Sequence, residues 1–455
     1  MLNDSNNNKD KNNSSSINNI SIEKQNPLEI NKFSPLQETT TFFSYEAKNK
    51  DKEKEANNEK PLNMTINIIN NQYICQQYNP FINMQYLYCY HTPSELFFDS
   101  LTKEINNYCN LTYKNIEYLN TIRCKYLKKI EKLIQFGLEK KYQIKFGHYG
   151  SYFTNLSIEG SDLDILVFYK PNNPNFDFLK DIIDLLNNHE NEFECIHPIL
   201  SASVPVIKLQ FNISNEIDHK KIQFLPYFDN KDISHIKIDL TFTFDENEFK
   251  RPDQIVSYIN KNIEDFCNIK PLLLVLKRYF RIMKMNKSYT GGLSSHSLFL
   301  LVLAFFKSNA LLNSSQLSLG KSLFIFFEKY SFFNYNDYGI DVEVPPYYYL
   351  LNENLNNIFN DYENRKEEIN IMDPFTKLNV AKSSFQVDEI KNTFNKALFF
   401  FKFEAWKYDS NNYQIFNNNI NTINNINNIN NLTITNNNNN VENDFIVIKK
   451  LFSIK

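Results

Sequence analysis

Two acidic residues separated by one apolar residue, Asp162 and Asp164, open a strongly apolar run of the sequence. On an extended strand alternate side chains share a face, so both carboxylates point to one side while the residues between them point into a core. A glycine-serine pair, Gly150-Ser151, precedes them and follows an alternating stretch over 142–146. This window therefore predicts a sheet with a tight strand-to-helix turn beside paired carboxylates.

Glycine is scarce in this chain and falls in two places. Of eight glycines in all, Gly147, Gly150 and Gly160 lie in the window just described, and Gly291 and Gly292 form a second cluster. Glycine is favoured where the backbone must turn tightly or approach a ligand. Both clusters are therefore candidate binding loops.

A third carboxylate completes a metal-binding pattern. Asp239 lies in the segment 236–242, where apolar and polar residues alternate as in a half-buried strand. Together with Asp162 and Asp164 it offers the oxygen ligands that Mg²⁺ prefers, with Mn²⁺ as the alternative ion. At the turn, the backbone N–H groups of Gly150 and the hydroxyl of Ser151 are suited to bind phosphate oxygens.

Each piece has a simpler explanation when it is taken alone. An Asp-x-Asp pair on a strand is more often two solvated edge residues than a metal site. The combination with a glycine-serine turn and a third strand aspartate favours the metal site, because no packing requirement asks for all three at once.

The chain resembles the nucleotidyltransferase superfamily, and within it the non-canonical poly(A) polymerases of the polymerase-sigma-like branch. The likeness runs from about Ser94 to Phe401. The matching motifs, in chain order, are Tyr149–Tyr152, Ser161–Asp164, Ser203–Lys208, Tyr289–Leu298, Phe326–Tyr330 and Asp373–Phe385.

This resemblance implies an α+β protein with a mixed-sheet catalytic domain and a mostly helical central, poly(A) polymerase-associated domain. The expected organisation is a disordered Asn/Lys-rich region over 1–92, two N-terminal helices over 93–140 that pack on the central domain, the catalytic domain over 141–250, the central domain over 251–402, and a low-complexity C-terminal tail over 403–455. The nucleotide is expected between the two domains.

A basic helix precedes the second glycine cluster. Lys270, Lys277, Arg281 and Lys284 are spaced so that they share one helical face. Such a face is most often simply solvated. The resemblance implies instead that Lys277 and Arg281 contact the β- and γ-phosphates, with Ser295 beside them.

The resemblance also implies which residues bind the base. His296 stands where the family usually has a tyrosine that stacks on the incoming base, and its smaller ring can be protonated. Asp373 and Asn379 belong to the nucleotide-recognition motif, which is one residue shorter here than in the family's usual form. Uridylyl-adding relatives often place a histidine in this motif, and the segment Thr376–Val380 has none.

These observations together predict template-independent addition of AMP from ATP to RNA 3′ ends by two-metal-ion catalysis, of the RNA surveillance or processing type, with Asp239 as the proton acceptor. The alternatives are a terminal uridylyltransferase, an inactive nucleotidyltransferase-like scaffold, and a transferase that makes 2′-5′ linkages or modifies a small molecule. The retained aspartates argue against the scaffold, and the motif Asp373–Phe385 argues against the last.

Composition indicates an intracellular protein. With 455 residues and 42% hydrophobic residues the chain can bury a core. Its six cysteines show no zinc spacing, and no apolar run is long enough to span a membrane. The net charge of −3 is low for a protein that grips RNA unaided, so we expect a separate RNA-binding subunit. The resemblance implies residence in the nucleus, with the cytoplasm as the alternative.

Overall fold

The computed structural model describes residues 91–201, 204–222, 233–311, 317–351, 367–426 and 446–454. Contacts divide the chain into two units, Met1–Asn71 and Gln72–Lys455, and all described residues belong to the second unit. The predicted N-terminal region over 1–92 therefore lies almost entirely outside the described residues. Ser203, the first residue of the motif Ser203–Lys208, also lies outside them.

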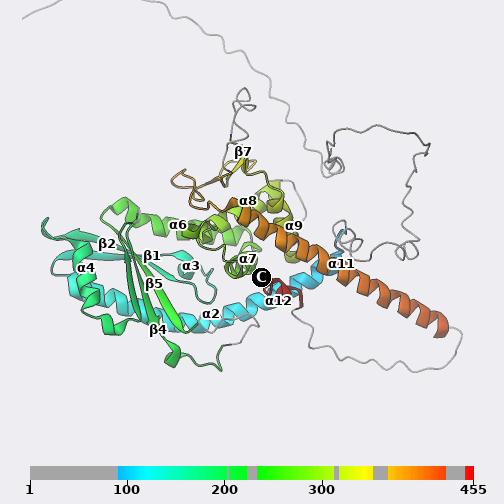
Figure 1. Ribbon diagram of the computed structural model, residues 1–455, viewed down its shortest axis with the longest axis horizontal. Coiled ribbons are helices and arrows are strands. Elements are labelled where there is room, and N and C mark those ends of the chain that lie inside the picture. The colour runs from blue at the N-terminus through cyan, green and yellow to red at the C-terminus, as the bar shows by residue number, and fades with distance from the viewer. Residues whose placement is uncertain are drawn as a thin grey trace, which may run out of the picture. The chain divides into compact units, whose positions relative to one another are not determined.

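A five-stranded mixed sheet forms one part of the described protein (Figure 1). Its strand order is β1-β2-β5-β4-β3, with β2 parallel to β5 and the other neighbours antiparallel. The strands are β1 Tyr142–Tyr149, β2 Leu163–Pro171, β3 Cys195–Ile199, β4 Val206–Asn212 and β5 His235–Thr243. The alternating apolar stretches predicted as strands are thus strands, and the α+β class is confirmed.

One face of this sheet is buried. Alternate residues such as Ile165, Val167 and Leu240 are fully buried in a core that they share with helices α2 (Glu95–Leu138) and α4 (Phe178–Asn187). The opposite face is covered in part by helix α6 (Glu246–Asp265), whose Phe249 packs near Phe168 with a ring-centroid separation of 5.3 Å. Both Asp164 and Asp239 lie on this second face, because their neighbours in sequence point into the core.

The second core is helical. It is built by α2, α7 (Ile269–Ile282), α8 (Ser295–Leu311), α9 (Leu319–Ser331) and α11 (Val387–Ile426). A small sheet of order β7-β6-β8 lies beside it, with β6 Tyr338–Asp341, β7 Tyr348–Leu350 and β8 Ile371–Met372. Among the described helices none combines the length and the apolar character needed to span a bilayer.

The N-terminal segment that was predicted to form two helices forms a single helix. Helix α2 runs without interruption over Glu95–Leu138, and the Ser94 hydroxyl caps it by accepting a bond from the backbone N–H of Phe97. The prediction of two helices was wrong, because the segment 111–114 contains neither proline nor glycine and its polar Thr112 is buried inside the protein.

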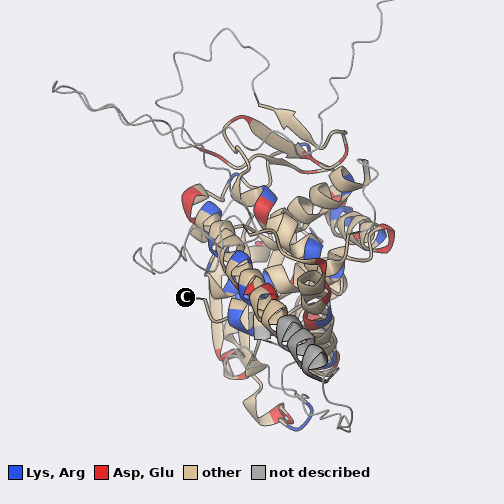
Figure 2. Ribbon diagram, turned by 90° about the vertical axis from the view of Figure 1, so that its right-hand side faces the viewer, with Lys and Arg blue, Asp and Glu red and all other residues tan. Residues whose placement is uncertain are grey.

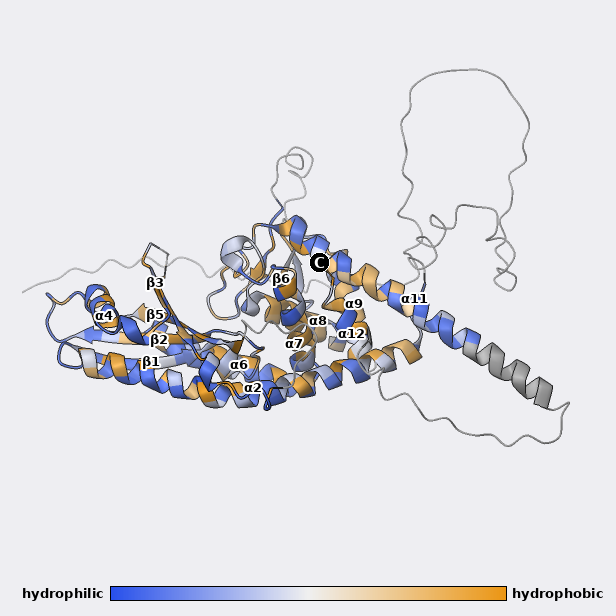
Figure 3. Ribbon diagram, turned by 60° about the horizontal axis from the view of Figure 1, so that its bottom comes forward, coloured by the Kyte–Doolittle hydropathy of each residue, from blue (hydrophilic) through white to orange (hydrophobic). Residues whose placement is uncertain are grey.

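Helix α2 also belongs to both cores rather than to the central domain alone. Its first half contributes Phe97 and Leu101 to the helical core, and its second half contributes Ile130 and Ile134 to the sheet core. Polar and apolar residues alternate along its length (Figure 3).

The C-terminal tail is more structured than predicted. Helix α11 passes the expected boundary at residue 402, and a short helix α12 (Ile446–Leu451) packs against α2. Glu104 of α2 accepts hydrogen bonds from the backbone N–H groups of Val447 and Ile448 at 2.8 and 2.9 Å. The low-complexity prediction was therefore wrong for these segments, because short apolar clusters on both sides of the Asn-rich tract find places in the helical core.

Candidate functional site

The sheet register brings the predicted carboxylates together. Asp164 on β2 is the direct neighbour of Asp239 on β5, and Asp162 immediately precedes β2. Burial raises the pKa of Asp164 to about 8, and the negative charges of Asp162 and Asp239 contribute. Burial also raises the pKa of Asp162, with Asp239 again the next cause. The three side chains therefore share one electrostatic environment.

They do not form a closed metal cage. The Lys208 ammonium on β4 donates a hydrogen bond to Asp239. In the described parts of the chain, no three His, Cys, Asp or Glu side chains converge closely enough to hold a metal ion. The carboxylates repel one another, and the Lys208 ammonium offsets part of that repulsion at Asp239. Sequence reasoning missed this role of Lys208.

The donor set nevertheless suits a hard divalent cation. Burial and the neighbouring carboxylates raise the pKa values of Asp162 and Asp164, so a cation bound there would replace a proton. Oxygen donors of this kind are the ligands that Mg²⁺ binds. To bind such an ion together with Asp162 and Asp164, Asp239 would have to exchange the Lys208 ammonium for the ion.

The glycine-serine turn lies directly against this site. Gly150 has a φ of 78°, and a Cβ at this position would collide with the carboxylate of Asp164. Gly150 therefore supplies both the left-handed backbone and the close approach. Ser151 follows in the short helix α3 (Gly150–Phe153), where its hydroxyl lies 3.4 Å from the hydroxyl of Ser157.

The two cations predicted to bind phosphate contact the loop that joins this turn to the aspartate pair. Lys277 donates to the carbonyl oxygen of Leu156 at 2.7 Å, and Arg281 donates to that of Glu159 at 3.0 Å. Burial lowers the pKa of Lys277 to about 8, although the charge of Asp164 opposes the shift. Both cations therefore lie near the site, where each donates to a carbonyl oxygen of this loop.

The predicted four-residue basic face of this helix is wrong. Lys284 lies beyond the end of α7 at a φ of 59°. Lys270, at the other end, lies over the ring of Tyr113 with its ammonium 4.6 Å from the ring centroid. Helical spacing alone could not show that α7 ends at Ile282, before Lys284.

A buried ion pair that the sequence did not reveal holds the same loop. Arg278 of α7 pairs with Glu159, and both side chains are almost completely buried. Asn115 of α2 also donates to Glu159 at 3.2 Å, and Arg123 donates to the carbonyl oxygen of Ser161 at 3.4 Å. Helices α2 and α7 thus fix the residues that lead into the first aspartate.

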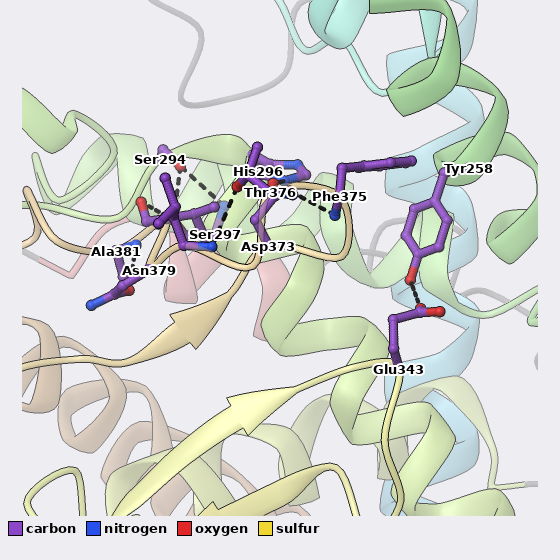
Figure 4. Close-up of polar contacts among 12 residues, drawn as sticks. Tyr258, Ser294, His296, Ser297, Glu343, Asp373, Phe375, Thr376, Asn379 and Ala381 are labelled. Carbon is purple, nitrogen blue, oxygen red and sulfur yellow. Dashed lines mark hydrogen bonds and ion pairs between the residues drawn. The ribbon is translucent and has the colours of Figure 1, made fainter. Parts of the chain in front are cut away.

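The predicted base-recognition motif forms a loop beside α8 (Figure 4). The His296 ring nitrogen Nε2 lies 3.2 Å from Asp373 Oδ2, while Asp373 Oδ1 accepts the backbone N–H groups of Phe375 and Thr376, both at 2.8 Å. Burial would raise the pKa of Asp373, but these hydrogen bonds hold it well below its usual range. Asp373 therefore orients the His296 ring and closes its own loop.

Asn379 supports the loop from within. Its side-chain oxygen accepts from the N–H groups of Ile371 and Ala381, and its amide nitrogen donates to the carbonyl oxygen of Ile369 at 3.0 Å. Both ends of the amide are thus used by the loop itself (Figure 4). Ser295 differs, because it lies exposed at the start of α8 while its neighbour Ser294 caps that helix.

Comparison with known proteins bears on this arrangement. Residues 101–243 match the family model of the poly(A) RNA polymerase, mitochondrial-like, central palm domain. This matched region contains the glycine-serine turn and all three aspartates. In this region the chain is similar to non-canonical poly(A) RNA polymerases.

Individual members of this family are distant. Poly(A) RNA polymerase gld-4 of Caenorhabditis elegans is 31% identical over 210 residues, which are 44% of this chain and 22% of the relative. Poly(A) RNA polymerase protein 1 of Saccharomyces cerevisiae is 24% identical over 328 residues, which are 70% of this chain and 46% of the relative. The inactive non-canonical poly(A) RNA polymerase protein Trf4-2 of Drosophila melanogaster is 28% identical over 207 residues, 43% of each chain.

The chain spans less than half the length of these three relatives. Among solved structures, the polymerase core of TRAMP, an RNA surveillance complex, is 20% identical, with 63% of this chain and 81% of that chain covered and a TM-score of 0.46.

Proposed function

We propose that this chain is a template-independent RNA nucleotidyltransferase that adds AMP from ATP to RNA 3′ ends. The observation that carries the proposal is the pairing of Asp164 with Asp239 across parallel neighbouring strands, with the Gly150 turn packed against Asp164. Chemistry of this class needs converging carboxylates beside a phosphate-binding turn.

The chain's own residues define the steps. Ser151 and the backbone of the turn bind the triphosphate, and Lys277 and Arg281 move from loop carbonyl oxygens to phosphate oxygens. Asp239 takes the proton of the attacking 3′-hydroxyl. A divalent ion held by the three aspartates would supply counter-charge for the reacting phosphoryl group. Because such chemistry depends on position and charge, loss of one carboxylate is more harmful than loss of one base contact.

Selection of adenine rests on the loop beside His296. The segment Thr376–Val380 offers no histidine side chain, and Asn379 is committed to the loop, so the base edge meets backbone groups of this loop. The His296 ring, oriented by Asp373, stacks on the base. A terminal uridylyltransferase is the alternative, and comparison of the four ribonucleotides distinguishes the two.

The test is primer extension. Purified protein, a 5′-labelled RNA primer and Mg²⁺ are combined with each ribonucleoside triphosphate in turn, and ATP is expected to give the most extension. Asp162→Ala and Asp239→Ala should fold normally and lose at least about 100-fold in rate, whereas Asp184→Ala, an exposed residue of α4, should match the wild type. Extension by either of the first two variants at a rate close to that of the wild type would contradict the carboxylate assignment.

An inactive scaffold is the second candidate. It is favoured by the existence of an inactive relative, the Trf4-2 protein. A wild-type protein that binds MgATP but extends no primer with any triphosphate would support it. Retention of all three aspartates supports the enzyme.

We also propose that a separate RNA-binding subunit assists the enzyme in the nucleus. Support comes from the net charge of −3 and from the charge distribution, since basic and acidic residues are interspersed along the described helices (Figure 2). Long-RNA affinity of the isolated chain should therefore be weak at physiological salt.

A further inference from the structure

Helix α11 carries a row of aromatic side chains along one of its faces. The members of this row, at spacings of four, three and seven residues, are Phe399, Phe403, Trp406 and Tyr413. At 100° per residue these spacings keep all four within about 40° of one line along the helix, over a length of about 21 Å. We call these four residues the α11 aromatic row.

This row faces away from the helical core. Phe394 and Phe401, on the opposite side of the same helix, are completely buried in that core. Phe399, in contrast, is 48% exposed and Tyr413 is 66% exposed. Trp406 is partly buried. Single exposed hydrophobic residues are ordinary, but an aligned row of large rings is typical of a binding surface.

The described part of the chain begins beside this row. Asp409 of α11 accepts hydrogen bonds from the backbone N–H of Ser94, at 3.0 Å, and from the Ser94 hydroxyl. The Nε2 atom of His91 lies 2.7 Å from the same carboxylate. By helical spacing Asp409 projects about 80° from the line of the row, so it lies on the flank of the row. The segment that precedes His91 is therefore tethered at this flank.

That preceding segment has an unusual composition. Residues 73–90 lie outside the described residues, and they contain six aromatic residues and no charged residue among eighteen. A segment of this kind gains free energy when its rings leave water, and aromatic rings pack well against one another. Eighteen residues extend up to about 60 Å, so the segment can reach every member of the row from its tether.

Other parts of the chain outside the described residues fit the row less well. Residues 1–72 contain many charged residues, and residues 427–445 are rich in Asn and contain a single aromatic residue, Phe445. The exposed Lys396 and Lys407 flank the row, at about 60° and 80° from its line. Tyrosine rings attract such cations to their faces, whereas a basic partner would be repelled. The uncharged, tyrosine-rich segment 73–90 therefore matches the surface both in chemistry and in position.

We propose that residues 73–90 dock on the α11 aromatic row. The aromatic rings of the segment pack on Phe399 and Trp406, and the contacts of His91 and Ser94 with Asp409 fix the end of the segment at the row. The row is thus an intramolecular docking surface that fastens the N-terminal part of the chain to the helical core. This inference is independent of the proposed function.

Trp406 offers a direct test, because it is the single tryptophan of the chain and belongs to the row. The full chain is compared with a variant that carries Tyr78→Ser, Phe81→Ser and Tyr86→Ser together. Loss of the docked rings should shift the Trp406 emission to longer wavelength and make the indole more accessible to acrylamide. The control carries Phe33→Ser, Phe42→Ser and Phe43→Ser, and its emission and quenching should match those of the wild type.

Hydrogen exchange tests the segment itself. Amides within 73–90 should exchange about ten-fold more slowly in the wild type than in Phe399→Glu, because a charge on the row opposes burial of the segment. Phe399 is exposed, so this variant should keep the thermal unfolding midpoint of the helical core. Phe136→Glu is the matched control, because Phe136 is 70% exposed in the second half of α2 and the same charge there should leave exchange unchanged.

The same measurements show what would overturn the proposal. Amides within 73–90 that exchange equally fast in the wild type and in Phe399→Glu would show that the segment does not dock on the row. Equal acrylamide quenching of the wild type and the triple segment variant would show that the row stays open, as expected for a surface that binds another protein. Shielding of Trp406 that disappears on dilution of the wild type would show that a second copy of the chain covers the row instead.

Discussion

At the scale of single residues, the site depends on one position that tolerates no side chain. Gly150 combines a φ of 78° with direct contact to the Asp164 carboxylate. The sequence predicted the glycine and the aspartate separately, but only the fold shows that they touch. Lys208 could not be predicted as the partner of Asp239, because the pairing depends on the β4–β5 register.

Gly150→Ala should abolish activity while leaving most of the fold intact. The added Cβ would displace the Asp164 carboxylate and strain the left-handed backbone, at a cost of about 1–2 kcal/mol in stability. The measurements are primer extension and thermal unfolding. Gly147→Ala, in the preceding strand β1, is the matched control, because a Cβ there meets the Phe249 ring at 3.2 Å and Leu166 at 3.6 Å, and activity should persist. An active Gly150→Ala protein would show that the contact does not matter.

The buried pair between Glu159 and Arg278 gives a stability prediction. Removing one partner leaves the other charge buried, so Glu159→Leu and Arg278→Leu should each lower the free energy of unfolding by about 3–5 kcal/mol. The double variant should lose less than the sum, because it leaves no uncompensated charge. Urea denaturation of the wild type, the two single variants and the double variant gives the double-mutant cycle. Strictly additive losses in the free energy of unfolding would argue against direct coupling of the two side chains.

At the scale of elements, strands were easier to predict than helix ends. Alternation marked β1 and β5 correctly because one face of each strand is buried, and a continuous apolar run marked β2. The boundaries inside α2 and at the end of α11 were mispredicted. Polar residues such as Thr112 and Asn115 interrupt the apolar pattern, yet they are buried where the two cores meet. Tertiary contacts, and not the local sequence pattern, thus determine where these helices begin and end.

The docking of α12 on α2 should depend on pH through Glu104. Burial raises the pKa of Glu104 to about 7 from 4.5, despite hydrogen bonds from the backbone of Ile448 and Val447. The protonated form is therefore favoured in the folded state, so its stabilising contribution is complete below pH 4.5 and is lost as pH rises through 7. The effect is on the order of 3 kcal/mol.

The measurement is the free energy of unfolding of wild type and Glu104→Gln between pH 4.5 and 8. The advantage of the wild type should shrink over this range, because glutamine does not ionise. Glu95→Gln, at an exposed position of the same helix, should give a constant difference. A constant difference for Glu104→Gln as well would exclude the mechanism.

At the scale of the whole described protein, two cores share one helix. Because α2 supplies buried residues to both, and because Arg278 and Lys277 tie α7 to the loop before β2, we expect the cores to unfold together. Fluorescence of Trp406, the single tryptophan, reports on α11, and hydrogen exchange of β2 and β5 amides reports on the sheet. Their denaturation midpoints should coincide, and separated midpoints would show independent cores.

Sharing α2 has a practical outcome for dissecting the protein. A fragment that begins at β1 would lack α2 and would expose Ile165 and Leu240 to water. A fragment that ends before β1 would keep α2 but would expose the apolar residues of its second half. Neither piece is a self-sufficient module. Any chimera that exchanges the sheet with a relative must therefore transplant the second half of this helix with it.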